Sequence, residues 1–111
     1  MKHVKTQAAF DKAIEANGVV LVDFYMSWCN PCGKLKPILA EIEKEYAEQQ
    51  KPLSMITLEI DDIPDMSRKY KVSAVPALFF FVNGKESGKK IVGFKEKPDI
   101  VERIDRELKK V

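Results

Sequence analysis

Hydrophobic positions along this chain follow two spacings, one typical of amphipathic helices and one typical of buried strands. The helical spacing, together with capping and stop residues, predicts helices at Thr6–Ala16, Pro31–Gln49, Pro64–Tyr70 and Pro98–Lys109. Continuous apolar runs predict strands at 19–25, 53–60, 77–82 and 89–92. Because the first three strands alternate with helices, the order is β-α-β-α-β, which is typical of an α/β fold.

The first predicted strand has the character of a central strand. Its run Val19–Val22 is apolar on both faces, as expected where helices cover both sides of a sheet, and only Asp23 interrupts it. At the other end of the chain, Asn83-Gly84 favours a tight reversal. We therefore expect the strands at 77–82 and 89–92 to pair antiparallel, through a connection longer than two residues.

The only two cysteines, Cys29 and Cys32, stand at the start of the long predicted helix. Residues three apart on a helical turn have Cβ atoms about 5–6 Å apart, and a disulfide needs about 3.8 Å, so a small adjustment opens or closes the bond. Pro31 fits the first turn, which puts Cys29 at the cap, where the helix dipole and free N–H groups favour a thiolate. Cys29 is thus the candidate nucleophile and Cys32 the resolving thiol.

Two other uses of a cysteine pair fit the chain less well. A structural zinc site needs four ligands, and beside the cysteines the chain offers only the lone His3, so we expect no metal site. A purely structural disulfide would close so short a loop that it stabilises the fold little. The pattern favours a thiol–disulfide redox site.

Composition and charge narrow the possible partners. At 111 residues the chain has the length of one domain, with 45% hydrophobic and 32% charged residues. The net charge of +2 comes from 19 basic and 17 acidic residues that are interspersed, so nothing favours nucleic acid. No apolar run approaches the length needed to cross a membrane. Met1–Thr6 has no apolar signal-type segment, which predicts a reducing, cytoplasmic location.

Several motifs, taken in order along nearly the whole chain, resemble the thioredoxin family. They are Val22–Tyr25, Trp28–Cys32, Pro37, Val75-Pro76 and Asn83-Gly84. The resemblance implies a single thioredoxin domain over residues 1–111, with a central mixed sheet of five strands in the order 1-3-2-4-5 and two helices on each face. It also implies dithiol–disulfide exchange, with a redox disulfide between Cys29 and Cys32 and no bound cofactor.

The resemblance assigns a role to Asp23, which would be costly to bury as a carboxylate. In the family this position is a buried general base that helps deprotonate the resolving Cys32 through water. The alternative is a structural carboxylate held by hydrogen bonds. We favour the general base, because a single acid in a buried strand beside a thiol site is typical of a tuned pKa.

Further positions would contact substrate. Pro76 resembles the family's cis-proline, which lets the Val75 backbone pair with an extended substrate segment, and an ordinary trans turn is the alternative. Trp28 resembles a flanking tryptophan that supports the loop and the docking surface, unless it is a core residue. Asn30 and Pro31, between the cysteines, affect the fit to partner proteins. Gly93 matches a glycine near the substrate groove, although a bulge or a strand end would explain it equally well.

The chain departs from the family pattern at three positions. Asn30 replaces the common glycine, so the reduction potential does not transfer with the resemblance. Tyr25 stands where tryptophan is frequent. Thr57 stands where many relatives carry a lysine near the buried aspartate. Without that ammonium group we expect Asp23 to experience desolvation alone, which raises its pKa.

The function predicted from these residues is that of a general protein-disulfide reductase. The expected partners are disulfide-containing proteins and a thioredoxin reductase that uses NADPH, and the expected state is a monomer. An isomerase or oxidase on the same fold is the alternative that Asn30 keeps open. A redox-inert binding module that uses the same groove is a third possibility, which the intact Cys29–Cys32 motif disfavours.

Overall fold

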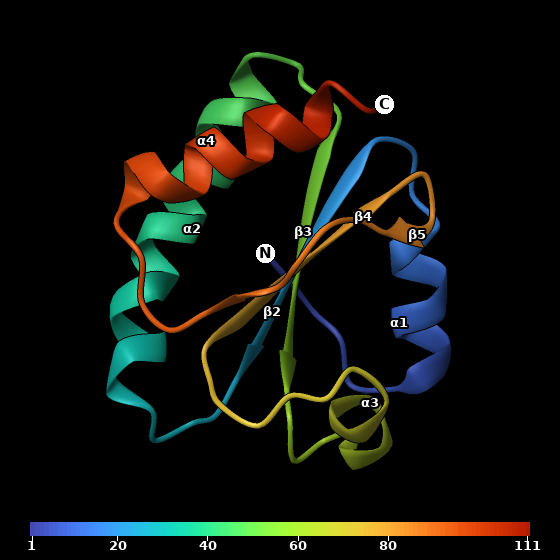
Figure 1. Ribbon diagram of the computed structural model, residues 1–111, viewed down its shortest axis with the longest axis vertical. Coiled ribbons are helices and arrows are strands. Elements are labelled where there is room, and N and C mark those ends of the chain that lie inside the picture. Colours follow the sequence, from blue (N-terminus) through green and yellow to red (C-terminus); the bar gives the residue numbers. More distant parts are fainter.

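The computed structural model describes residues 1–111 and has a central sheet with two helices on each face (Figure 1). The helices are α1 (Gln7–Ile14), α2 (Asn30–Glu48), α3 (Pro64–Lys69) and α4 (Lys97–Leu108). The strands are β1 (Lys2–His3), β2 (Val19–Tyr25), β3 (Leu53–Glu59), β4 (Ala77–Val82), β5 (Lys85–Glu86) and β6 (Ile91–Val92). None of the helices combines the length and the apolar character needed to span a membrane.

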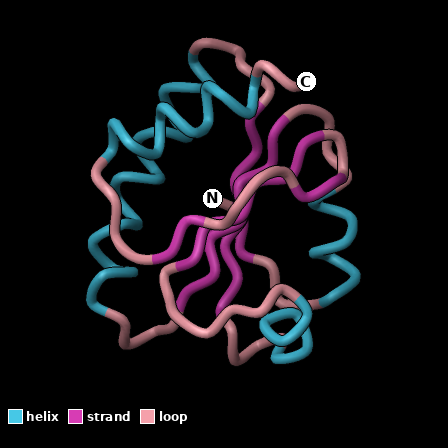
Figure 2. The backbone as a smooth tube through the Cα atoms, viewed as in Figure 1, coloured by secondary structure: helices cyan, strands magenta, loops and turns pink.

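The sheet is mixed, as predicted, with the strand order β1-β3-β2-β4-β5 and with β6 also paired to β4. The β1–β3 and β3–β2 pairs are parallel, whereas β4 runs antiparallel to β2. In Figure 2 the strands form one twisted layer between the helices. The predicted α/β fold is therefore confirmed, although six strands form where five were expected.

The additional strand arises at the predicted reversal. Asn83 and Gly84 have φ values of 51° and 86°, which are the left-handed conformations of a two-residue hairpin turn. This turn pairs β5 with the end of β4, and the chain then returns so that β6 pairs with the beginning of β4. The longer connection expected between 77–82 and 89–92 thus contains a short strand of its own.

Strand β1 has no signal in the hydrophobic pattern. Its two residues, Lys2 and His3, are exposed and polar, so the sequence offers no alternation to detect. They are held by parallel pairing with Ile56 and Thr57 of β3. Only the tertiary fold brings these segments together.

The alternation of side chains along β2 separates two hydrophobic layers. Residues 20, 22 and 24 pack on the side of α1 and α3, in one core cluster with Phe10 and Met66. Residues 19 and 21 pack on the side of α2 and α4, in a second cluster with Leu35 and Ile104. By the same alternation Asp23 points to the α2 side, toward the helix that begins with the two cysteines.

Candidate active site

Cys29 and Cys32 form a disulfide at the start of α2, with their Cα atoms 5.2 Å apart. Cys29 is the N-cap residue, as predicted, and its Sγ accepts a hydrogen bond from the Cys32 N–H at 3.2 Å. Cys29 is half-buried, whereas Cys32 is only 6% exposed. An incoming disulfide can therefore approach the first sulfur, and the second is shielded from solvent.

The local sequence explains why the helix begins at this point. Pro31 lies in the first turn, where its missing N–H leaves no hydrogen bond unmade. The Gly33 N–H donates to the Cys29 carbonyl oxygen at 3.1 Å, so the cap residue accepts a helical hydrogen bond. Before the helix, the Ser27 hydroxyl donates to a carboxylate oxygen of Glu59 and ties the loop to the end of β3.

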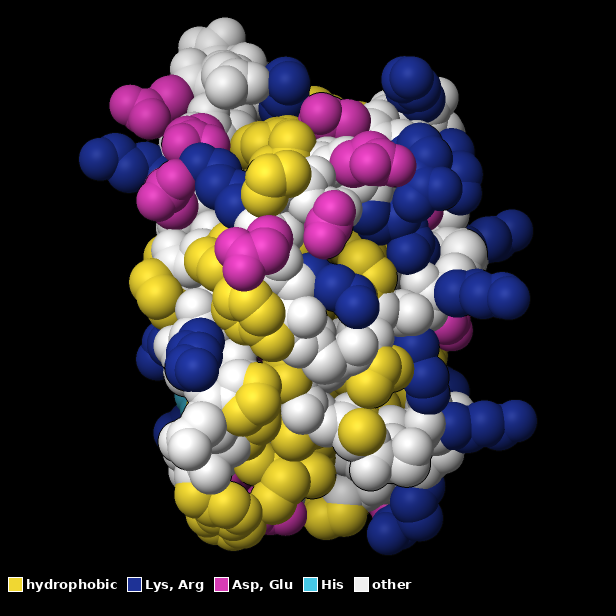
Figure 3. Space-filling view, turned by 60° about the vertical axis from the view of Figure 1, so that its left-hand side comes forward, with side chains coloured by type: hydrophobic (Ala, Val, Ile, Leu, Met, Phe, Trp, Pro, Cys, Tyr) yellow, Lys and Arg dark blue, Asp and Glu magenta, His cyan; other side chains and the backbone are white.

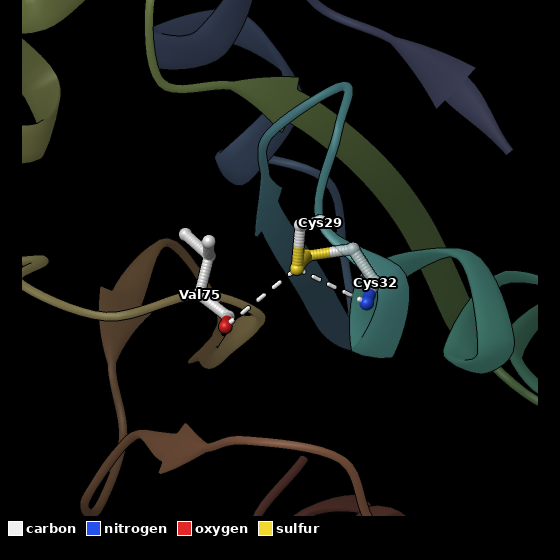
Figure 4. Close-up of a disulfide and its surroundings, with 3 residues drawn as sticks. All are labelled: Cys29, Cys32 and Val75. Carbon is white, nitrogen blue, oxygen red and sulfur yellow. Dashed lines mark hydrogen bonds between the residues drawn. A yellow bond between two sulfur atoms is a disulfide. The ribbon is translucent and has the colours of Figure 1, made fainter.

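The segment around Pro76 lies opposite the disulfide. The Val75–Pro76 peptide bond is cis, which excludes the ordinary trans turn. The carbonyl oxygen of Val75 points at Cys29 and lies 3.8 Å from its Sγ (Figure 4). Residues 46 positions apart in the sequence thus form the two sides of the site.

Gly93 is hydrogen-bonded to the segment that contains Pro76. Its N–H donates to the Pro76 carbonyl oxygen at 2.8 Å, and its φ of 89° is a conformation that residues with a Cβ rarely adopt. Gly93 follows β6 directly, so it is a strand end and also a neighbour of the Val75-Pro76 segment. The two interpretations of this glycine are compatible.

The residues flanking the cysteines lie at the surface. Trp28 is 72% exposed, which excludes a core tryptophan, and Asn30 and Pro31 are exposed as well. Figure 3 shows hydrophobic side chains gathered at the lower end of one face, the end at which β2 leads into α2 in Figure 1. This end of the molecule offers an apolar surface beside the disulfide.

Behind the disulfide lies a cavity of about 190 Å³, lined by Asp23, Cys32, Lys36 and Thr57 among others. Asp23 is 4% exposed, and its Oδ1 atom is buried without a hydrogen-bond partner in the protein. Burial raises the pKa of Asp23 from 3.8 to about 7, and the positive charge of Lys36 acts in the opposite direction. The carboxyl group can therefore exchange a proton near neutral pH.

The expectation that Asp23 experiences desolvation alone is wrong. Thr57 is indeed in register with Asp23 across the parallel β2–β3 pair, so the strand brings no ammonium group to the carboxylate. Lys36 supplies a positive charge from α2 instead. The sequence contained a signal for this residue, since Lys36 is one helical turn beyond Cys32 and hence on the same side of the helix.

Tyr25 also lines the cavity, where many relatives carry tryptophan. Its hydroxyl lies 3.3 Å from Nε2 of His3 on β1. The lone histidine of the chain thus contacts a residue at the edge of the site. Sequence spacing offered no indication of this contact, because it depends on the pairing of β1 with β3.

The site combines a disulfide at the N-terminus of a helix, a buried carboxyl group behind the disulfide and a cis-proline in front of it. This combination defines the class of thiol–disulfide oxidoreductases. Comparison with known proteins agrees. The chain belongs to the thioredoxin family, since the family model described as Thioredoxin matches residues 1–106. It is 36% identical to the thioredoxin of Staphylococcus aureus over 103 residues, which cover 93% of this chain and 94% of the relative.

Solved structures show the same fold. A mutant thioredoxin from Halobacterium salinarum superposes with a TM-score of 0.85 and 26% identity, covering 96% of this chain and 89% of the other. The thioredoxin of Plasmodium falciparum gives a TM-score of 0.84 and 26% identity, covering 96% and 98%. The chain is accordingly an enzyme, a thiol–disulfide oxidoreductase of the protein-disulfide reductase type, whose redox group is its own disulfide.

Proposed function

We propose that the chain acts, as a single thioredoxin domain, as a general reductant of protein disulfides. The carrying observation is the unequal exposure of the two sulfurs, with Cys29 reachable beside the Val75 carbonyl and Cys32 buried toward Asp23. Such an arrangement suits one thiol for attack and the other for resolution. The reaction starts from the reduced form of the protein, in which both cysteines are thiols.

In the first step the Cys29 thiolate attacks one sulfur of a substrate disulfide. A Cys29–substrate disulfide forms, and the other substrate sulfur leaves as a thiolate that takes up a proton. Helix α2 stabilises the Cys29 thiolate, because its free N–H groups and its dipole favour negative charge at the cap. The Val75 backbone would pair with an extended substrate segment, which its position beside Cys29 supports.

In the second step Cys32 resolves the mixed disulfide. Asp23 accepts the proton of the Cys32 thiol, and the resulting thiolate attacks Cys29 Sγ. The bond between Cys29 and the substrate breaks, the second substrate thiolate departs, and the Cys29–Cys32 disulfide forms. Two electrons pass to the substrate disulfide, and the protein ends in the oxidised state of this structure.

The oxidised protein must then be reduced again. We assign this step to a thioredoxin reductase that draws electrons from NADPH, and we place the cycle in the cytoplasm, because a dithiol reductant needs a reducing compartment. Trp28, Asn30 and Pro31 are exposed beside Cys29 and would contact both substrates and the reductase. The protein would work as a monomer, with this surface free.

Asn30 favours one competing function. It is the first residue of α2 and stands between the two cysteines in the sequence, where a change of side chain alters the relative stability of the dithiol and the disulfide. A less stable disulfide would make the protein an isomerase or oxidase. The reduction potentials of these classes differ, from about −270 mV for thioredoxin to about −180 mV for protein disulfide isomerase and about −120 mV for DsbA.

The test is the equilibrium reduction potential, measured against defined thiol–disulfide buffers by Trp28 fluorescence and by thiol alkylation. A midpoint near about −270 mV is expected for the reductant. A midpoint near about −180 mV or above would instead support the isomerase or oxidase. Catalytic reduction of an insulin-type disulfide substrate excludes the redox-inert binding module, and absence of turnover would contradict the proposed function.

A further inference from the structure

We propose that Lys36 is a positioning residue for the resolution step: its ammonium group, at the cavity behind the disulfide, keeps Asp23 ready to accept the proton of Cys32. The proposal rests on the proposed function for the role of Asp23. It adds a residue outside the cysteine motif to the site. It also identifies a source of positive charge near Asp23 in a protein whose strand β3 carries threonine, and not lysine, at position 57.

The geometry places Lys36 beside the reacting groups. It lies four residues after Cys32 on α2, so both side chains project from the same side of the helix. Helical side chains lean toward the N-terminus, which directs the Lys36 stem back over the turn that carries Cys32. Lys36, Cys32 and Asp23 accordingly line one cavity, and the exposed lysine can keep its ammonium group hydrated.

No other cation faces the carboxyl group. On the neighbouring strands Asp23 is in register with Thr57 of β3 and Leu78 of β4, both uncharged. Among the residues that line the cavity, Lys36 alone is basic. The buried Oδ1 atom of Asp23 has no hydrogen-bond partner in the protein, so hydrogen bonding does little to stabilise the ionised form. The charge of Lys36 is thus the protein's main compensation for burying this carboxylate.

This compensation matters because a base must be ionised to accept a proton. Burial alone favours the protonated carboxyl group, which cannot take the proton of Cys32. A nearby positive charge stabilises the carboxylate, so a larger fraction of molecules holds the base in its working state at neutral pH. Loss of the charge should slow resolution near pH 7 and leave the attack by Cys29 unchanged.

The first experiment measures the carboxyl group of Asp23 directly. Three oxidised proteins, the parent, Lys36→Met and Lys36→Arg, are labelled with ¹³C at the aspartate carboxyl carbons. The carboxyl group of Asp23 is then titrated in each of them by NMR. We expect Lys36→Met to raise the pKa of Asp23 above about 7, and Lys36→Arg to keep the parent value. Lys34→Met is the matched control, since Lys34 is exposed on the same helix and does not line the cavity.

The second experiment follows the two chemical steps. Reduced protein is mixed rapidly with a disulfide-bonded peptide, and the mixed disulfide is followed as it forms and decays. We expect Lys36→Met to slow the decay about fivefold at pH 7 and to leave formation unchanged. The loss should disappear near pH 9, where Asp23 is ionised with or without the lysine. In the double variant Lys36→Met/Thr57→Lys, the new lysine replaces the lost charge from the sheet side, and the decay of the mixed disulfide at pH 7 should regain its parent rate.

Two results would overturn the proposal: a pKa of Asp23 that is unchanged in Lys36→Met, or one that rises as much in Lys34→Met. A loss of rate that is equal at every pH would also contradict it, because a structural defect does not depend on the ionisation of Asp23. The NMR titration needs no substrate. It can therefore succeed or fail independently of whether the protein proves to be a reductant.

Discussion

Asp23 of β2 lies in register with Thr57 of β3, and both side chains line the cavity behind the Cys29–Cys32 disulfide. Thr57 is 8% exposed and brings no charge to the carboxyl group. The environment of Asp23 is therefore set by burial on the sheet side and by Lys36 on the helix side. This division makes the contribution of each side separable by mutation.

A lysine introduced at position 57 should lower the pKa of Asp23. Its ammonium group would stabilise the carboxylate from the sheet side, in addition to Lys36. The measurement is an NMR titration of the carboxyl group in Thr57→Lys, with Thr57→Met as a control for the change in volume. An unchanged or higher pKa in the lysine variant would show that position 57 does not act on Asp23 through charge.

Replacing Asp23 should stabilise the oxidised protein in a pH-dependent way. The folded pKa of about 7 lies above the reference value of 3.8, so the ionised group opposes folding at neutral and alkaline pH. We expect Asp23→Asn to raise the free energy of unfolding by about 2–4 kcal/mol at pH 8. The gain should shrink as the pH falls from 7 toward 4, because the native protein then binds a proton that the unfolded chain does not.

Urea unfolding of Asp23→Asn and the parent at several pH values checks this sign. Stabilisation that stays constant between pH 4 and pH 8 would mean that packing, and not the charge of Asp23, causes the change. The same variant should resolve mixed disulfides slowly at pH 7. Higher stability combined with a slower reaction would indicate that the buried carboxyl group is present for catalysis.

The two cysteine variants should fail in different ways. Cys32→Ser retains the exposed nucleophile and loses the resolving thiol, so it should accumulate covalent adducts with substrate proteins that dithiothreitol releases. Cys29→Ser should form no adducts and show no turnover. Non-reducing gels and mass spectrometry of Cys29 distinguish these outcomes. Recovery of Cys32→Ser entirely in the free form after exposure to a disulfide substrate would contradict the assignment of Cys29 as the nucleophile and Cys32 as the resolving thiol.

Two glycines near the site should respond to alanine with opposite signs. Gly93 has a φ of 89° and open space where a Cβ would lie, so Gly93→Ala should destabilise the fold by about 1 kcal/mol through backbone conformation alone. Gly33 lies within α2, also with open space, and Gly33→Ala should stabilise it by about 0.5–1 kcal/mol. Urea midpoints measure both effects, and a stabilising Gly93→Ala would contradict this account.

The reversal at Asn83-Gly84 illustrates how far local sequence reaches. The dipeptide predicts a tight turn, and the turn forms with the left-handed φ values that these residues tolerate. The strand that follows it, Lys85–Glu86, is exposed and polar and could not be predicted. It forms because the turn places it against Val82 and Phe81 of a strand that is already fixed.

The chain by itself determined the element types and the start of α2. Apolar runs, helical spacing and Pro31 act over a few residues, so they place Cys29 at a helix cap without help from the rest of the fold. Only the tertiary structure decided what surrounds the two sulfurs. Val75 in front and Thr57 behind come from distant segments, and the effect of Lys36 on Asp23 depends on how α2 packs on the sheet. Burial and charge act between residues that are close in space, and the distance between residues along the sequence does not show which of them are close.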